Sequence, residues 1–188
     1  MALPLVTYRE TSSMRDRNSK PVVVADETVQ IVTFQVGTEQ YGLEINSISE
    51  IVRPHRITPL PRMSEFIEGV INLRGTIIPI VDLRKRFALA MIHDNPRKLR
   101  MMITRGAVHG AAGNGKELLG LVVDGVNEVI HVPKKDIETA PEAALGASSD
   151  FITGMGKVAD RLIILLDITR ILSQQERVAL AEAGNAEP

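Results

Sequence analysis

The sequence predicts a mainly β protein made of two similar lobes, each of about five short strands, followed by a C-terminal helix. Short apolar segments bounded by turn residues run along most of the chain, as is typical of strands. Aromatic residues are only 3% of the total, so Ile, Val and Leu must build the core, and strands favour such side chains. The second half of the chain also repeats the first, which predicts two lobes.

The repeat consists of two matching blocks. Residues 41–52, YGLEINSISEIV, match residues 119–130, LGLVVDGVNEVI. Further on, FIEGV at Phe66 and PIVDLRKRF match FITGM at Phe151 and LLDITRIL. Chance does not keep Gly, Glu, Phe and Asp in the same order in both blocks. We therefore expect two lobes whose sheets close on themselves and so avoid exposed edges.

The first copy begins after a long N-terminal tail, residues 1–27. Val32, Phe34 and Val36 alternate with polar residues and predict a strand, and residues 40–45 predict the returning one. Asn46 is a possible cap for a short helical stretch over residues 47–52, which Pro54 would end. Residues 53–62 hold three prolines and predict an extended connector.

The central segment, residues 68–87, predicts a β-hairpin with a two-residue turn. Residues 69–73 and 76–81 form the two strands, and a helical turn opens at Asp82. Gly75 supplies the positive φ that such a turn needs. Pro79 lacks an amide hydrogen and predicts a bulge or an edge at that point.

The turn also holds Arg74, at a position where Asn or Asp is usual. We expect its guanidinium to be free in solvent at the tip of the hairpin. A charge that serves only to solvate the surface is the alternative, because most surface charges make no specific contact.

The second copy begins with strands at residues 99–104 and 117–124, and the pattern changes period at Asp167. Ile168, Ile171, Leu172 and Ala179 lie on one face of a predicted helix that Asp167 caps and Gly184 ends. The expected organisation is lobe one over residues 28–92, lobe two over 97–166, the helix over 167–183 and a tail over 184–188.

Composition excludes several classes of function. The formal net charge of −1 disfavours nucleic acid as a partner, and the absence of cysteine removes thiol chemistry and disulfides. The four histidines are scattered without metal-ligand spacing. No apolar stretch approaches the ~20 residues of a membrane span, and no secretory signal is visible, so we expect a cytoplasmic protein.

Candidate catalytic and phosphate-binding residues lack the context that their chemistry requires. Residues 110–116 contain Gly110, Gly115 and Lys116 in Gly-x4-Gly-Lys spacing, but Glu117 stands where a phosphate-binding loop has a hydroxyl, and a strand follows. We therefore expect no nucleotide there. Asp82 and Asp167 are repeat mates at the starts of helical turns, which favours capping over acid–base catalysis. The chain is interpreted as a binding module without cofactor or metal.

The motifs YGLEINSISEIV, GVINLRGTIIPIVDLR, GLVVDGVNEV and FITGMG followed by RLIILLDITRIL resemble the CheW family of bacterial chemotaxis coupling proteins. The resemblance spans residues 28–176, and the NLRG turn followed by PIVDLR is its most specific part. It implies two SH3-like five-stranded β-barrel lobes with a shared apolar core. It also implies a non-enzymatic adaptor that joins the cytoplasmic tip of methyl-accepting chemotaxis receptors to the regulatory domain of the chemotaxis histidine kinase, and so is recruited to membrane-associated receptor arrays.

The resemblance also assigns site residues. Arg74 and Glu50, with Ile48 and Ile51 nearby, match positions of receptor contact, and Gly120 and Val126 match positions of kinase contact. The alternative for Gly120 and Val126 is a packing role in strand and core. The long tail and the Gly-rich loop over residues 106–116 depart from the family pattern. The same adaptor role in pilus or gliding motility is the alternative function, and a nucleotide-binding protein that uses residues 110–116 is a more distant one.

Overall fold

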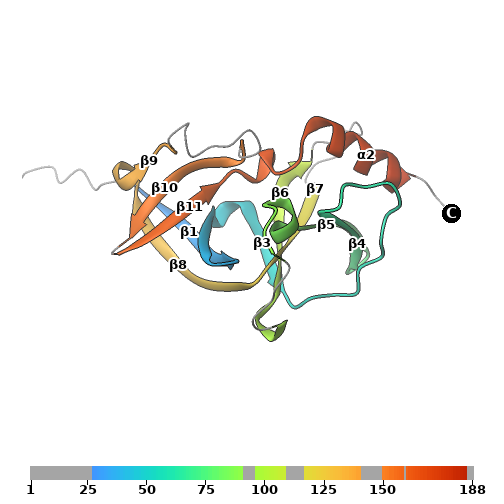
Figure 1. The fold of residues 1–188 in the computed structure, drawn as a ribbon, viewed down its shortest axis with the longest axis horizontal. Helices are drawn as coiled ribbons and strands as arrows, with labels where there is room; N and C mark the ends of the chain where they lie inside the picture. The colour runs from blue at the N-terminus through green and yellow to red at the C-terminus, as the bar shows by residue number, and fades with distance from the viewer. Residues whose placement is uncertain (1–26, 91–95, 109–116, 141–149, 159, 186–188) are drawn as a thin grey trace, which may run out of the picture.

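The computed structural model describes residues 27–90, 96–108, 117–140, 150–158 and 160–185. Eleven strands within these ranges form two sheets, which lie side by side (Figure 1). The expected tail over residues 1–27 lies almost entirely outside the described residues. So do most of the loop over 106–116, with the Gly-x4-Gly-Lys segment, and residues 186–188 of the C-terminal tail.

We call the two sheets lobe A and lobe B; both are short, curved SH3-like sheets. Lobe A has the strand order β8-β1-β2-β11-β10-β9 and lobe B the order β3-β6-β7-β5-β4. The strands of lobe A are β1 (Thr28–Val36), β2 (Glu39–Glu44), β8 (Gly125–Pro133), β9 (Ile137–Glu138), β10 (Ile152–Val158) and β11 (Arg161–Leu166). The strands of lobe B are β3 (Ile48–Val52), β4 (Ile67–Leu73), β5 (Thr76–Asp82), β6 (Arg100–Val108) and β7 (Glu117–Val123).

Each lobe takes strands from both copies of the repeat. β1 and β2 of the first copy pair with β8 and β11 of the second, while β6 and β7 of the second copy pair with β3 and β5 of the first. The lobes therefore divide the chain differently from the expected ranges 28–92 and 97–166. Lobe A also has a sixth strand, β9, where five strands were expected.

The two copies share their local geometry. The β4–β5 hairpin shifts register between Ile67 and Gly69, and the β10–β11 hairpin shifts between Ile152 and Gly154. Asp82 then caps α1 (Leu83–Arg86), and its repeat mate Asp167 caps the short helix η5 (Ile168–Arg170). The predicted capping role of both aspartates is confirmed.

The apolar core is shared between the lobes, as the resemblance implied. One cluster joins both sheets and includes Phe34 and Leu43 of lobe A with Leu119 and Leu121 of lobe B. A smaller cluster fills each lobe: one contains Ile71 and Ile103, and the other contains Ile31 and Ile163. The two lobes therefore cannot separate without exposing apolar surface.

One expectation about the first copy is wrong, and another holds for part of a strand. Residues 47–52 do not form a helix: η1 (Ile45–Ser47) is a single 3-10 turn, and β3 follows and pairs with β6. The expected edge at Pro79 is confirmed for part of a strand: β5 is central in the sheet order, but its residues 76–79 pair with β4 alone. The pairing of β5 with β7 begins at Ile80, directly after the residue that lacks an amide hydrogen.

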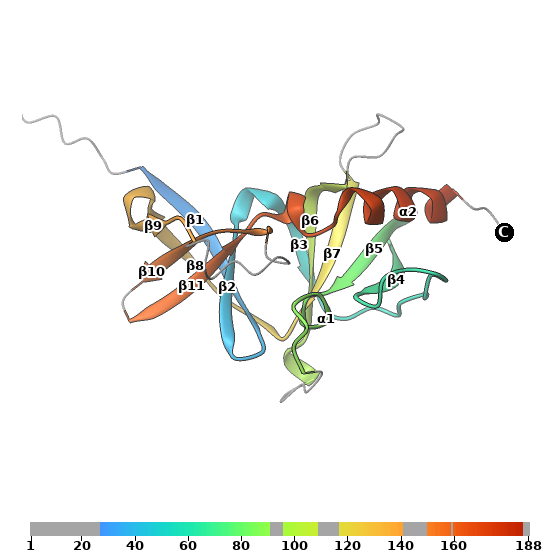
Figure 2. The ribbon, with the colours of Figure 1, turned by 45° about the horizontal axis from the view of Figure 1, so that its top comes forward.

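The C-terminal helix is shorter and starts later than predicted. Ile168, Ile171 and Leu172 are buried at and after η5, but α2 runs over Gln174–Asn185 and includes Gly184. Ser173 and Glu176 form a reciprocal cap, in which each side chain accepts the other residue's backbone amide. Figure 2 shows α2 lying along lobe B, and Leu180 is its buried contact with the shared core.

Candidate functional site

The tip of the β4–β5 hairpin is a two-residue turn in which both central residues have positive φ. Arg74 has φ 53° and Gly75 has φ 87°, and the Gly75 amide donates to Asn72 Oδ1 at 2.8 Å. Positive φ at both positions matches the right-handed twist of the flanking strands. The prediction for Gly75 is confirmed, and Arg74 occupies a conformation that an arginine rarely adopts.

The guanidinium of Arg74 is exposed but not free, so that expectation is wrong. Its Nη1 and Nη2 donate to Glu50 Oε1 and Oε2 at 3.2 and 3.0 Å. The Arg74 side chain is 77% exposed and that of Glu50 28%. An exposed ion pair of this kind contributes only about 0–1 kcal/mol to stability. The main effect of the Arg74–Glu50 pair is therefore to orient the Arg74 side chain.

The ion pair bridges the two ends of the lobe B sheet. Glu50 lies on β3, the first strand in the order, and Arg74 lies at the tip of the β4–β5 hairpin at the other end. Glu50 sits next to a register shift in the β3–β6 pairing, and such shifts re-aim side chains. The pair therefore closes the sheet into a barrel while leaving the arginine at the surface.

Exposed apolar residues flank this pair along the chain. Ile51 follows Glu50 and is 41% exposed, and Ile77 lies three residues after Arg74 and is 57% exposed. We call Glu50, Ile51, Arg74 and Ile77 the lobe B seam. Ile48 precedes it on β3 and is half-buried against the shared core, so of the two isoleucines assigned to receptor contact, Ile51 is the more accessible.

The two residues assigned to kinase contact lie in different lobes. Gly120 is buried in β7 of lobe B, and a Cβ there would lie 2.4 Å from Ile80 Cδ1. Val126 lies on β8 of lobe A, half-buried against the shared core. The fold thus separates them, and Gly120 has the surroundings of a packing glycine.

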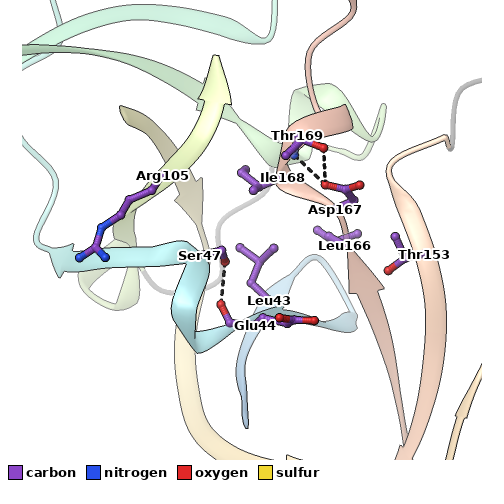
Figure 3. A pocket seen from close by; sticks show the side chains of 9 residues that line it. All are labelled: Leu43, Glu44, Ser47, Arg105, Thr153, Leu166, Asp167, Ile168 and Thr169. Carbon is purple, nitrogen blue, oxygen red and sulfur yellow. Dashed lines mark hydrogen bonds between the residues drawn. The ribbon is translucent and has the colours of Figure 1, made fainter. Parts of the chain in front are cut away.

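A cavity of about 430 Å³ lies where the two lobes meet. Figure 3 shows Leu43, Leu166 and Ile168 together at its centre, with Arg105 on one side and Thr153 on the other. Asp167 at its wall accepts hydrogen bonds from the backbone amide and hydroxyl of Thr169. Three apolar and six polar or charged residues line the cavity.

The part of the chain that the structure describes offers little for catalysis or metal binding. No group of three His, Asp or Glu residues in it could hold a metal ion, and none of its helices is long and apolar enough to cross a membrane. Burial raises the pKa of the Asp82 carboxyl, but that group caps α1 through the amides of Arg84 and Lys85. The histidines at 93 and 109 lie outside the described residues.

Sequence reasoning missed two features of the surface. The Glu50–Arg74 pair was not foreseen, because the two residues are far apart in sequence and only the closure of the sheet brings them together. A second ion pair joins Arg161 Nη2 to Glu128 Oε1 at 2.8 Å in lobe A. Its signal was present in the repeat, since Glu128 is the repeat mate of Glu50.

Comparison with known proteins identifies the family. The family model of the CheW-like domain matches residues 30–176. The chain is 34% identical to the chemotaxis protein CheW of Klebsiella aerogenes over 81% of its own length and 88% of the relative. It is 33% identical to the CheW of Treponema pallidum, with 86% and 92% covered.

A solved structure has the same fold. The scaffolding protein TtCheW from Thermoanaerobacter tengcongensis matches with a TM-score of 0.66 and 34% identity, over 80% of this chain and 91% of that one. The family model covers most of the chain, and the two relatives and the solved structure are 33–34% identical to it. All of them point to the same family. The chain belongs to the CheW family of chemotaxis scaffold proteins.

Proposed function

We propose that this protein is a non-enzymatic adaptor that couples the cytoplasmic tip of chemotaxis receptors to the chemotaxis histidine kinase. Membership of the CheW family supports the adaptor role. In this proposal the protein acts in the cytoplasm, recruited to receptor arrays at the membrane. Use of the same adaptor in a related motility pathway remains the alternative, and the partners that bind would decide between them.

The lobe B seam is the proposed receptor surface. It includes the exposed cation of Arg74, paired with Glu50, and the exposed side chains of Ile51 and Ile77. Such a surface fits an amphipathic segment that offers a carboxylate beside an apolar contact. The observation that carries the proposal is the exposed arginine at a left-handed turn position, since the turn itself is better served by Asn or Gly.

The kinase is proposed to bind lobe A, near Val126. Gly120 then acts indirectly, because its lack of a side chain lets Ile80 pack over β7. This arrangement gives each partner a lobe of its own, as an adaptor requires. In this proposal Gly120, which is buried, does not itself contact the kinase.

Charge reversal at Arg74 tests the receptor surface. Arg74→Glu should weaken binding of a receptor tip fragment by about tenfold or more through lost charge complementarity. Binding of the kinase regulatory domain should stay within about twofold. The measurement is titration calorimetry with each partner separately, after circular dichroism has shown an intact fold.

Two further variants serve as controls. Arg56→Glu reverses an exposed arginine outside the seam and should change neither affinity. Glu50→Arg combined with Arg74→Glu keeps the two charges opposite but inverts the surface, so receptor binding should stay weak. Equal loss of both partners in a folded Arg74→Glu protein would contradict the assignment of this seam to the receptor.

A further inference from the structure

The chain crosses from lobe B to lobe A at Asp124, the residue between β7 and β8. Its carboxylate binds both lobes at that point. Asp124 Oδ1 accepts from Arg84 Nε on α1, directly after β5 of lobe B, at 2.7 Å. Asp124 Oδ2 accepts from the backbone amide of Gly37, in the β1–β2 turn of lobe A, at 2.6 Å. We call Arg84, Asp124 and Gly37 the junction latch.

The junction latch is largely shielded from solvent. The side chains of Arg84 and Asp124 are 9% and 16% exposed, and Arg84 Nη1 also donates to the Ala90 carbonyl at 2.7 Å. Because water and salt screen a buried pair only weakly, the attraction in this pair is stronger than in the exposed pair of Glu50 and Arg74. A rotation of one lobe against the other at this side of the junction would have to break a buried charge pair, which is costly.

The internal repeat places a second crossing between the lobes at an equivalent position. The β5–β7 and β11–β2 pairs are both parallel. In the first pair Ile80 lies opposite Gly120. In the second pair the repeat mates of these residues, Leu165 and Gly42, lie opposite each other. Since the chain crosses between the lobes after β2 as it does after β7, the two crossings are equivalent sites of one duplicated fold.

The second crossing has no latch of this kind. The repeat mates of Arg84 and Asp124 are Thr169 and Asn46, so the two charged residues have uncharged counterparts. The Thr169 hydroxyl donates to Asp167 Oδ1, two residues before it, and not across the junction (Figure 3).

The cavity of about 430 Å³ between the lobes lies at this second crossing. Seven of the residues that line it are repeat mates of residues within three positions of Arg84 or Asp124: Leu43, Glu44, Ser47, Leu166, Asp167, Ile168 and Thr169. The cavity thus lies where the first crossing has a buried arginine. In Figure 2, α1 lies below the junction, and the segment that leads into α2 lies above it.

We propose that the junction is a one-sided hinge. The junction latch holds the lobes together on one side, and the cavity on the other side is the part that changes shape. The shared core keeps the lobes in contact throughout. Leu43, Leu166 and Ile168 belong to that core and also line the cavity. Unlike the close-packed interior, the cavity leaves these side chains room to move, so a small rotation of the lobes widens or narrows it without breaking either sheet.

The hinge gives an adaptor a way to transmit a change from one partner to the other. This consequence rests on the proposed function, which places the receptor on lobe B and the kinase on lobe A. A partner that binds one lobe angle better than another shifts the chain toward that angle. The surface of the other lobe then moves with it.

Distances between spin labels on the two lobes test the hinge. The chain contains no native cysteine, so Thr76→Cys on β5 of lobe B and Lys157→Cys on β10 of lobe A take labels at two defined and exposed positions. Pulsed electron–electron resonance then measures the distribution of the distance between the lobes. This measurement needs no partner, so its outcome is separate from that of the adaptor proposal.

Substitutions in the latch and at its repeat-equivalent positions have opposite expected effects. Arg84→Met and Asp124→Asn should each broaden the distance distribution by about twofold or more, because the lobes are no longer held on that side. The double substitution Asn46→Asp and Thr169→Arg builds the ion pair at the second crossing and should narrow the distribution below that of the wild type. Glu50→Gln breaks an ion pair within lobe B and should leave the distribution unchanged.

An unchanged distribution in folded Arg84→Met and Asp124→Asn would overturn the hinge. If circular dichroism shows that both variants have lost their fold, the double substitution at Asn46 and Thr169 decides. A narrower distribution in that folded protein supports the hinge, and an unchanged or broader one overturns it. A distribution that broadens equally in Glu50→Gln would also overturn it, because the effect would then not be specific to the latch.

Discussion

Arg74 and Gly75 show how a turn can be set by geometry and still present an exposed charge. Both have positive φ, and glycine adopts this conformation without the steric cost that a Cβ brings. Gly75 therefore adopts the turn conformation at low cost. Arg74 adopts it at a higher steric cost and places a cation at the tip of the hairpin. The Glu50 carboxylate holds that cation in one direction.

Gly75→Val should lower the free energy of unfolding by about 1–2 kcal/mol, because a β-branched residue is forced into the left-handed region. Apart from Gly75 and its two chain neighbours, no residue of the described part of the chain lies within 4 Å of the position that a Cβ would take, so the cost is conformational and not a clash. Gly75→Asn should cost less, since Asn tolerates this region. Urea unfolding of the three proteins checks the order, and equal stability of the Val and Asn variants would contradict it.

At the scale of elements, the sequence predicted strands and hairpins where the signal is local. The β4–β5 hairpin, the β1–β2 pair and both aspartate caps depend on residues a few positions apart. β3 was missed because Ile48, Ile51 and Val52 have helical spacing, and the pairing of β3 with the distant β6 overrides that local signal. The late start of α2 was signalled by Ser173 and Glu176, whose capping-box spacing was overlooked.

The cap of α1 should make stability depend on pH through Asp82. Burial raises the pKa of its carboxyl in the folded state, and the amides of Lys85 and Arg84 only partly offset this. Between the unfolded and the folded pKa the folded state binds more protons, so this group's contribution to the free energy of unfolding falls as pH rises.

Asp82→Asn keeps a good cap and removes the titration. Relative to the variant, the wild type should therefore lose stability as pH rises from below the unfolded-state pKa of the Asp82 carboxyl to neutrality. Thermal unfolding of both proteins over this range measures the difference. A difference that is constant, or that favours the wild type more at higher pH, would contradict the burial effect.

At the scale of the molecule, the repeat was visible in the sequence but the exchange of strands was not. Gly42 and Gly120, or Asp82 and Asp167, align by residue type alone. Which copy pairs with which depends on contacts between distant strands, such as β2 with β11 and β5 with β7. The site was likewise predicted residue by residue, whereas the Glu50–Arg74 pair forms only when the lobe B sheet closes.

The exchange predicts that neither half of the chain folds alone. A fragment of residues 1–95 keeps the β1–β2 and β4–β5 hairpins but lacks β8, β11, β6 and β7, which pair with β1, β2, β3 and β5. A fragment of residues 96–188 lacks the corresponding strands of the first copy. Each should show the narrow amide proton dispersion of an unfolded chain, and mixing the two should restore a folded spectrum. Cooperative unfolding of either fragment by itself would contradict the exchanged architecture.

Sedimentation velocity of the chain with a receptor tip fragment and the kinase regulatory domain tests the proposed adaptor role. We expect a complex with each partner alone and a larger ternary complex when all three are mixed, because the proposed receptor and kinase surfaces lie in different lobes. Competition, in which excess receptor fragment displaces the kinase domain and no ternary species forms, would contradict an adaptor with one lobe for each partner.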